Sequence, residues 1–169
     1  MKTYVLFVAA LAVSAPALAQ QPTDAQIASI VVTANQVDID AGKLAEARGA
    51  SAEVKAFGKQ MAADHARVNA SAVALVTKLK VTPEDNPTSK ALKAGGDKNL
   101  AALEGLGGAA FDRAYIANEV AYHQQVLDAV DTVLIPGAKN DELKALLVKV
   151  RPAFVSHLEH AKRVQAELK

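Results

Sequence analysis

Cysteine is absent from this chain of 169 residues, and aromatic side chains are scarce, with four phenylalanines, three tyrosines and no tryptophan. Without cysteine, the protein can form no disulfide bond, thiol nucleophile, thiolate zinc site or iron–sulfur cluster. Packing alone must stabilise the fold, which a chain of this length can achieve. The scarcity of aromatics, together with abundant alanine and short β-branched runs, favours helices over sheets.

An excess of one charge is also missing, because 19 Lys and Arg residues stand against 18 Asp and Glu residues. Binding of nucleic acid requires a clustered basic face that displaces counterions, so the balanced charge argues against a nucleic-acid partner. The sequence contains no Gly-x-Ser-x-Gly motif of serine hydrolases, no P-loop and no Gly-x-Gly-x-x-Gly motif. These absences disfavour hydrolase and nucleotide-binding functions.

An apolar run from Tyr4 to Val13 follows Lys2 and precedes Ala17-Leu18-Ala19. A charged residue, a short apolar segment and a small-residue cleavage site are typical of a secretory signal peptide, which we assign to residues 1–19. About ten apolar residues cannot cross about 30 Å of hydrocarbon, so a membrane anchor is disfavoured. Cysteine is absent after this run, so a lipoprotein anchor has no point of attachment.

The mature chain, residues 20–169, then has a net charge near zero, because Lys2 is the only charged residue removed. We expect export across the inner membrane and residence in the periplasm or at the outer membrane, with no transmembrane span in the mature chain. The partner stays open, and both peripheral association with the envelope and a homo-oligomer agree with this composition.

Four segments carry apolar residues at alternating steps of three and four, which predicts four helices that each bury one face. Thr23 and Gln26 form the capping-box pattern at the start of the first helix. Short connections within the first and last helix pairs predict two antiparallel hairpins. The expected helices cover residues 24–48, 51–80, 111–134 and 141–168.

A long connection joins the two predicted hairpins over residues 81–109. Prolines and glycines, among them Gly95 and Gly96, are expected to interrupt any long helix here and to leave short helical pieces near residues 89–93 and 97–103. Two hairpins joined by a long crossover are the connectivity of ferritin-like four-helix bundles. We therefore predict an all-α, ferritin-like four-helix bundle as a single domain over residues 20–169.

Three of the four histidines, His65, His123 and His157, fall on the apolar faces of three different predicted helices. Asp38 borders the apolar face of the remaining helix, and Glu119 lies four residues before His123 on the same face. With a rise of about 1.5 Å per residue, Asp38 and the three histidines all fall in the middle third of the bundle. The sequence therefore predicts one polar layer inside an apolar core.

Two interpretations of this layer stay open. Imidazole and carboxylate groups in a bundle core can bind zinc, iron or copper, which makes His65, His123, His157, Asp38 and Glu119 candidate metal ligands. A buried hydrogen-bonded network of the same groups would satisfy them without metal and would hold the helices in register. The chain lacks the Glu-x-x-His motif that ferritin-like di-iron sites carry on two helices. Imidazole nitrogens more than about 6 Å apart with no carboxylate between them would exclude a preformed site.

Three segments together carry a family resemblance: DIDAGKLAEARGASAEVKAFGKQMAADHARVN (Asp38–Asn69), FDRAYIANEVAYHQQVL (Phe111–Leu127) and RPAFVSHLEHAKRV (Arg151–Val164). Gly-Lys-Leu-Ala, Asp-His, Phe-Asp-x-x-Tyr and Pro-x-x-x-x-His occur in this order, and the chain resembles the bacterial family named domain of unknown function 4142. The similarity covers nearly the whole mature chain. It implies an exported protein, often described as an outer-membrane protein, with a ferritin-like fold and no established activity.

The resemblance also places the family's polar residues on this chain. Its Asp-His pair falls on Asp64 and His65, its later histidines on His123 and His157, and its acidic residues before Gly-Lys-Leu-Ala on Asp38 and Asp40. The family often has an acidic residue before the histidine of the third helix, where this chain has Tyr122, and it commonly has leucine where this chain has Arg151. The first departure weakens a scheme in which the preceding acid orients each histidine. Asp64 is expected to be a local or interhelical partner.

The leading interpretation is an exported helical-bundle protein of the Gram-negative envelope that is non-catalytic and acts through binding or in stress. The alternative is a metal-binding or metal-oxidising ferritin-like protein that holds a divalent transition metal, zinc, iron or copper, in its core.

Overall fold

Polar side chains at the helix starts divide the chain into its elements. The structure is a computed structural model that describes residues 21–168. Thr23 and Gln26 form the expected capping box, and Ser51, Asn86 and Asn140 each accept a backbone N–H at the start of a later helix. Within the described residues every regular element is helical, which confirms the all-α class. The elements are α1 (Asp24–Arg48), α2 (Ala52–Leu79), α3 (Pro87–Glu104), α4 (Gly108–Ala129), the π-helical turn η1 (Val130–Leu134), α5 (Ile135–Gly137) and α6 (Asp141–Glu167).

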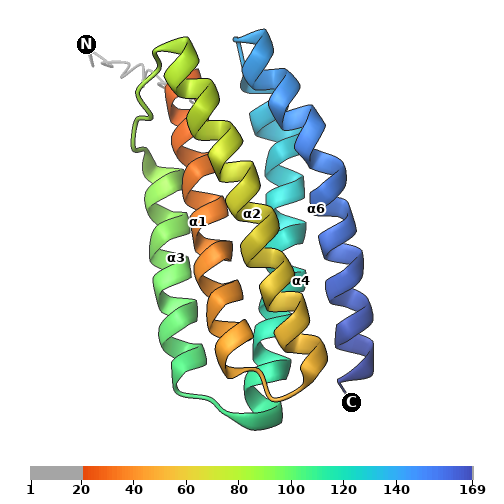
Figure 1. The fold of residues 1–169 in the computed structure, drawn as a ribbon. Helices are drawn as coiled ribbons and strands as arrows, with labels where there is room; N and C mark the ends of the chain where they lie inside the picture. Colours follow the sequence, from red (N-terminus) through yellow and green to blue (C-terminus); the bar gives the residue numbers. More distant parts are fainter. Residues whose placement is uncertain (1–20, 169) are drawn as a thin grey trace, which may run out of the picture.

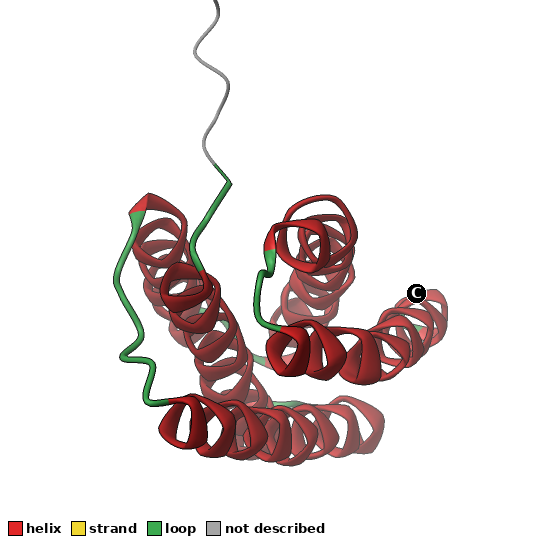
Figure 2. Ribbon diagram, turned by 90° about the horizontal axis from the view of Figure 1, so that it is seen from above, coloured by secondary structure: helices red, strands yellow, loops and turns green. Residues whose placement is uncertain are grey.

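Four long helices, α1, α2, α4 and α6, lie side by side, and α3 flanks α1 on the outside (Figure 1). Helices α1 and α2 run antiparallel, as do α4 and α6, while α3 returns the chain from one end of the molecule to the other. The view from above in Figure 2 shows the same grouping, with α3 beyond α1 and away from α6. The signal-peptide prediction concerns residues 1–19, which lie outside the described residues.

The expectation of only short helical pieces between residues 81 and 109 was wrong, because α3 is one continuous helix of 18 residues that includes Gly95 and Gly96. Its start is favourable, since Asn86 caps it and Pro87 occupies the first turn, where a missing N–H costs nothing. Gly96 faces Val37 so closely that an added Cβ would lie 2.7 Å from a valine methyl carbon. Packing against α1 thus compensates for the low helix propensity of glycine, and the fold has a fifth helix.

The helical path through α4 is also longer than the predicted 111–134. It begins at Gly108, passes through the π-helical turn η1, and continues past Pro136 to Gly137. In η1 the N–H of Ile135 donates to the carbonyl of Val130, five residues earlier. This wider turn shifts the hydrogen-bond pattern just before the proline and lets the chain stay helical there.

The backbones of α1 and α2 come very close at Gly42 and Gly58. A Cβ added to Gly42 would lie 2.7 Å from the carbonyl oxygen of Gly58, and one on Gly58 would lie 2.6 Å from the carbonyl oxygen of Gly42. This contact lies one turn from Asp38 on α1 and two turns from His65 on α2. The two glycines therefore set the distance and the register at which these side chains face each other.

Two of the three apolar clusters in the described interior lie on either side of the polar layer. One contains Phe57, Met61, Phe111 and Tyr115, all completely buried, near the α1–α2 connection. The other contains Ile27 and its apolar neighbours near the α5–α6 connection. The polar layer between them is surrounded by packed side chains, so its electrostatic interactions are poorly screened by water.

Candidate metal centre

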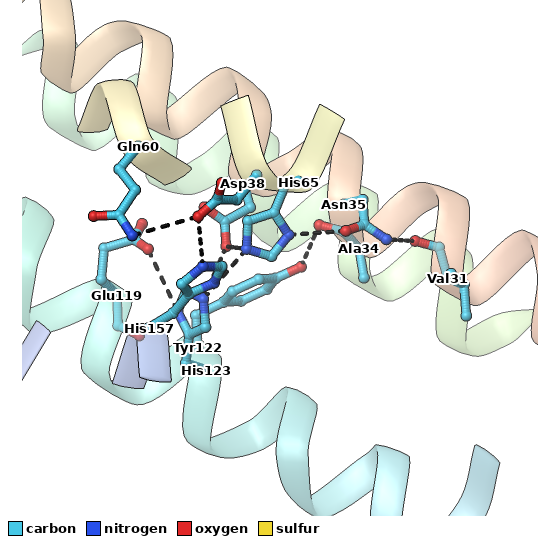
Figure 3. Close-up of polar contacts among 11 residues, drawn as sticks. Val31, Ala34, Asn35, Asp38, Gln60, His65, Glu119, Tyr122, His123 and His157 are labelled. Carbon is cyan, nitrogen blue, oxygen red and sulfur yellow. Dashed lines mark hydrogen bonds and ion pairs between the residues drawn. The ribbon is translucent and has the colours of Figure 1, made fainter. Parts of the chain in front are cut away.

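The five side chains singled out in the sequence converge in one buried layer (Figure 3). Asp38 comes from α1, His65 from α2, Glu119 and His123 from α4, and His157 from α6. None of them is more than 3% exposed. Asp40, the second acidic residue implied by the family resemblance, pairs with Gln36 at the surface of α1 and does not join the layer. His160 also lies outside it, against the ring of Phe57.

Three potential ligand atoms form a nearly equilateral triangle. Asp38 Oδ2 lies 3.2 Å from His65 Nε2 and 3.5 Å from His123 Nε2, and the two nitrogens are 3.4 Å apart. Atoms that bind one ion at about 2.0–2.1 Å in tetrahedral geometry lie about 3.3 Å from one another. The separation is far below the 6 Å limit set above, and a carboxylate lies between the imidazoles, so the geometry permits a preformed site.

The outer nitrogens of these two imidazoles are held by hydrogen bonds that determine the tautomers. Asn35 donates from Nδ2 to the carbonyl of Val31 at 2.8 Å, so its Oδ1 accepts from His65 Nδ1 at 2.8 Å. His123 Nδ1 donates to the backbone carbonyl of Glu119 at 3.0 Å. In the neutral rings both Nε2 atoms therefore carry lone pairs directed toward Asp38. Histidine ligands of metal ions typically donate their other N–H to such an acceptor.

Burial changes the protonation of the layer in a consistent direction. It lowers the pKa of His123 to about 4 and the pKa of His65 well below its ordinary value, so both rings are neutral at pH 7. It raises the pKa of Asp38 to about 8, and it raises the pKa of Glu119 well above its ordinary value, with the charge of Asp38 adding to the effect. Without a cation, the favoured forms are thus neutral imidazoles and protonated acids.

Several polar atoms of the layer have no hydrogen-bond partner among the described residues. These atoms are both oxygens of Asp38, Oε2 of Glu119 and Nδ1 of His157. Asp38 Oδ2 is close to two nitrogens, but neither nitrogen carries a proton on that side. Buried polar groups without partners are rare and costly, so these atoms are available to bind a proton or a cation.

His157 forms the edge of the layer nearest the solvent. Its Nε2 lies 3.0 Å from Asp64 Oδ2, and the half-buried Asp64 also contacts Gln60 and Arg67. Asp64 is therefore the interhelical and local partner that the sequence predicted. The ring centroid of His157 lies 5.2 Å from that of His65 and 5.4 Å from that of His123. One nitrogen from each of the three rings lies within 4.8 Å of the others, which makes His157 available as a third imidazole.

Sequence reasoning missed Asn35 as the residue that orients His65. Its position three residues before Asp38, on the same face of α1, was the available signal. It also missed Phe154, whose ring stacks on that of His65 with centroids 5.3 Å apart and planes inclined by 3°. These two contacts fix the His65 ring from its edge and its face.

Comparison with known proteins gives the family. The family model described as Domain of unknown function (DUF4142) matches residues 9–164, so the chain belongs to that family. Neither the curated proteins nor the solved structures include a match. Within residues 21–168, none of the helices combines the length and the apolar character needed to cross a membrane.

Proposed function

We propose that this member of the DUF4142 family is a metal-binding protein whose core holds one divalent transition-metal ion between Asp38 Oδ2, His65 Nε2 and His123 Nε2. One observation carries the proposal: three buried acceptor atoms face one another with separations of 3.2–3.5 Å. The role we propose is binding, in an exported protein of the periplasm or outer membrane. The signal-peptide pattern of residues 1–19 and the family resemblance support that location.

A metal-free hydrogen-bonded network, the other interpretation of the layer from the sequence, would satisfy fewer of these atoms. If Asp38 is protonated, its single proton can be donated to only one of the two Nε2 atoms, and the other lone pair stays unpaired. A cation at the centre of the triangle would satisfy all three acceptors.

The donor set favours certain metals. Two neutral imidazoles and one carboxylate suit zinc, copper or iron(II), and two histidines with one carboxylate are typical of non-haem iron(II) sites with open coordination positions. Calcium and magnesium prefer oxygen ligands. His157 would supply a third nitrogen, and its bond to Asp64 matches the carboxylate–histidine pairs found beside bound metals. We also interpret the two antiparallel helix pairs and their α3-containing crossover as a ferritin-like arrangement.

The test is equilibrium metal binding by purified protein that has first been treated with a chelator. Zinc, iron(II) and copper(II) are titrated separately, with calorimetry for affinity and elemental analysis for stoichiometry. We expect one tightly bound ion per chain. Asp38→Asn and His123→Ala should each weaken binding by more than about 100-fold, because they remove a direct ligand.

His160→Ala is the matched control, because this histidine lies on the same helix as His157 but outside the layer. It should bind metal as the wild type does. Circular dichroism of every variant verifies folding, and Asp38→Asn preserves side-chain size. Wild-type protein that binds none of the three ions above nonspecific levels would refute the proposal, and so would unchanged affinity in both ligand variants.

A further inference from the structure

A cavity of about 100 Å³ lies directly beside the polar layer, among α1, α4 and α6. Its wall is almost entirely apolar, and the ring of His65 and the ring of Phe154 form part of it. The π-helical turn η1 contributes Val130 and Leu134. The ring of His65, which Asn35 and Phe154 orient, therefore forms part of the wall of an apolar cavity.

Two polar side chains of the inner cavity wall, Tyr122 and Asn35, already have partners. Tyr122 donates its hydroxyl to the carbonyl of Ala34 at 2.8 Å, and Asn35 uses its amide for Val31 and His65. Thr88 and Gln125, which also line the cavity, are exposed on its α3 side, and His65 directs its Nε2 toward Asp38, so the inner wall is mainly apolar. A charged or strongly polar molecule would lose its hydration without compensation, whereas an apolar molecule would gain by leaving water.

A path to the surface runs between α3 and α4. Thr88, Leu92, Tyr122 and Gln125 line both this cavity and a neighbouring depression that reaches the exposed Gly95. Thr88 and Gln125 are exposed, while Leu92 and Tyr122 are half-buried between them and the interior. A small molecule would therefore reach the cavity from the surface past Leu92 and Tyr122.

The size of the cavity limits the occupant. An engineered apolar cavity of roughly 150 Å³ in another protein binds benzene and xenon. A volume of about 100 Å³ is two-thirds as large and is open on the α3 side, so a single six-membered ring or a short alkyl chain is the upper limit.

We propose that this cavity is a binding site for a small, uncharged, apolar molecule no larger than a single ring, which contacts His65 and Phe154 and enters between α3 and α4. The inference does not depend on the proposed metal function. Because an occupant touches His65, its binding would also be coupled to any ligand of the polar layer, and the coupling must be reciprocal.

Benzene is the probe, and all measurements use metal-free protein in the presence of a chelator, so that failure of the metal proposal leaves this test intact. Calorimetry and thermal denaturation should show saturable binding with a dissociation constant below about 1 mM and a melting temperature that rises with benzene concentration. Phenol, which adds one hydroxyl, should bind at least about 10-fold more weakly, because its hydroxyl would be buried without a partner.

Two substitutions on α4 fill the cavity, namely Ala129→Leu and Val126→Phe. Either variant should weaken benzene binding by at least about 10-fold. The second variant keeps the test valid if the first does not fold. Val148→Phe is the matched control, because Val148 is 53% exposed and lies outside the cavity. Absence of saturable benzene binding in the wild type, or equal affinity in both folded cavity-filling variants, would overturn the proposal.

Discussion

Substituting Gly42 by alanine should destabilise the protein and displace the polar layer at the same time. The added Cβ would lie 2.7 Å from Gly58 O and 2.9 Å from Ala62 N, both of them backbone atoms that cannot rotate away. Carbon contacts are favourable only from about 3.5 Å, so α1 and α2 must separate by several tenths of an ångström.

The expected net loss of stability follows from two opposing effects. Overpacking costs about 1–3 kcal/mol, while replacing a helical glycine by alanine stabilises by about 1 kcal/mol. We expect a net loss of up to about 2 kcal/mol in the free energy of unfolding, or a melting temperature lower by up to about 8 °C. Separation of the helices would also move Asp38 from His65, so metal affinity should fall although no ligand has been changed.

Gly95→Ala supplies the matched control. Gly95 is also a helix-interior glycine, but it is exposed and no atom lies within 4 Å of its added Cβ. That variant should be more stable by about 0.5–1 kcal/mol and should bind metal normally. Urea denaturation of both variants, with metal titration of the folded proteins, provides the measurement. If Gly42→Ala were as stable as Gly95→Ala, the close contact would not determine the helix register, and the reasoning would fail.

Further predictions concern the polar layer itself. Burial raises the pKa of Asp38 to about 8 and the pKa of Glu119 well above its ordinary value, so the folded protein holds protons that the unfolded chain has lost. The unfolding free energy of metal-free protein should therefore fall as the pH rises from 6.5 to 8. Asp38→Asn should reduce this slope in urea denaturation, and a wild-type slope that is already flat would contradict the assignment. Asn35→Ala should lower the free energy of unfolding by about 1–3 kcal/mol and weaken metal binding by about 10–100-fold, because His65 loses the acceptor that orients it. An unchanged metal affinity in calorimetry would contradict that role. Asp64→Asn should weaken metal binding by less than Asp38→Asn does, since it removes only the partner of His157; stopped-flow and equilibrium titrations compare the two variants.

The composition of the polar layer could be predicted from helical periodicity and helix rise, because both depend only on local backbone geometry. His65, His123 and His157 replace apolar residues on their helices, and counting about 1.5 Å per residue puts them at similar heights. The same local reasoning failed at Gly95 and Gly96, where it weighed helix propensity but could not include packing against Val37. It also placed the end of the helix before Pro136, since a π-helical turn has no clear pattern in a single sequence.

The amino-acid sequence by itself determined the four long helices α1, α2, α4 and α6, which of their faces are apolar, and which chemistry is excluded by the absence of cysteine. Only the tertiary structure decided that Asp38 Oδ2 and two Nε2 atoms face one another, that Asn35 and the Glu119 carbonyl hold the outer nitrogens, and that an apolar cavity adjoins His65. The physical reason is that helix rise gives a height to within about one turn, whereas ligand geometry depends on tenths of an ångström. The distances between ligand atoms are set by interhelical contacts such as that of Gly42 with Gly58, which join residues on different helices.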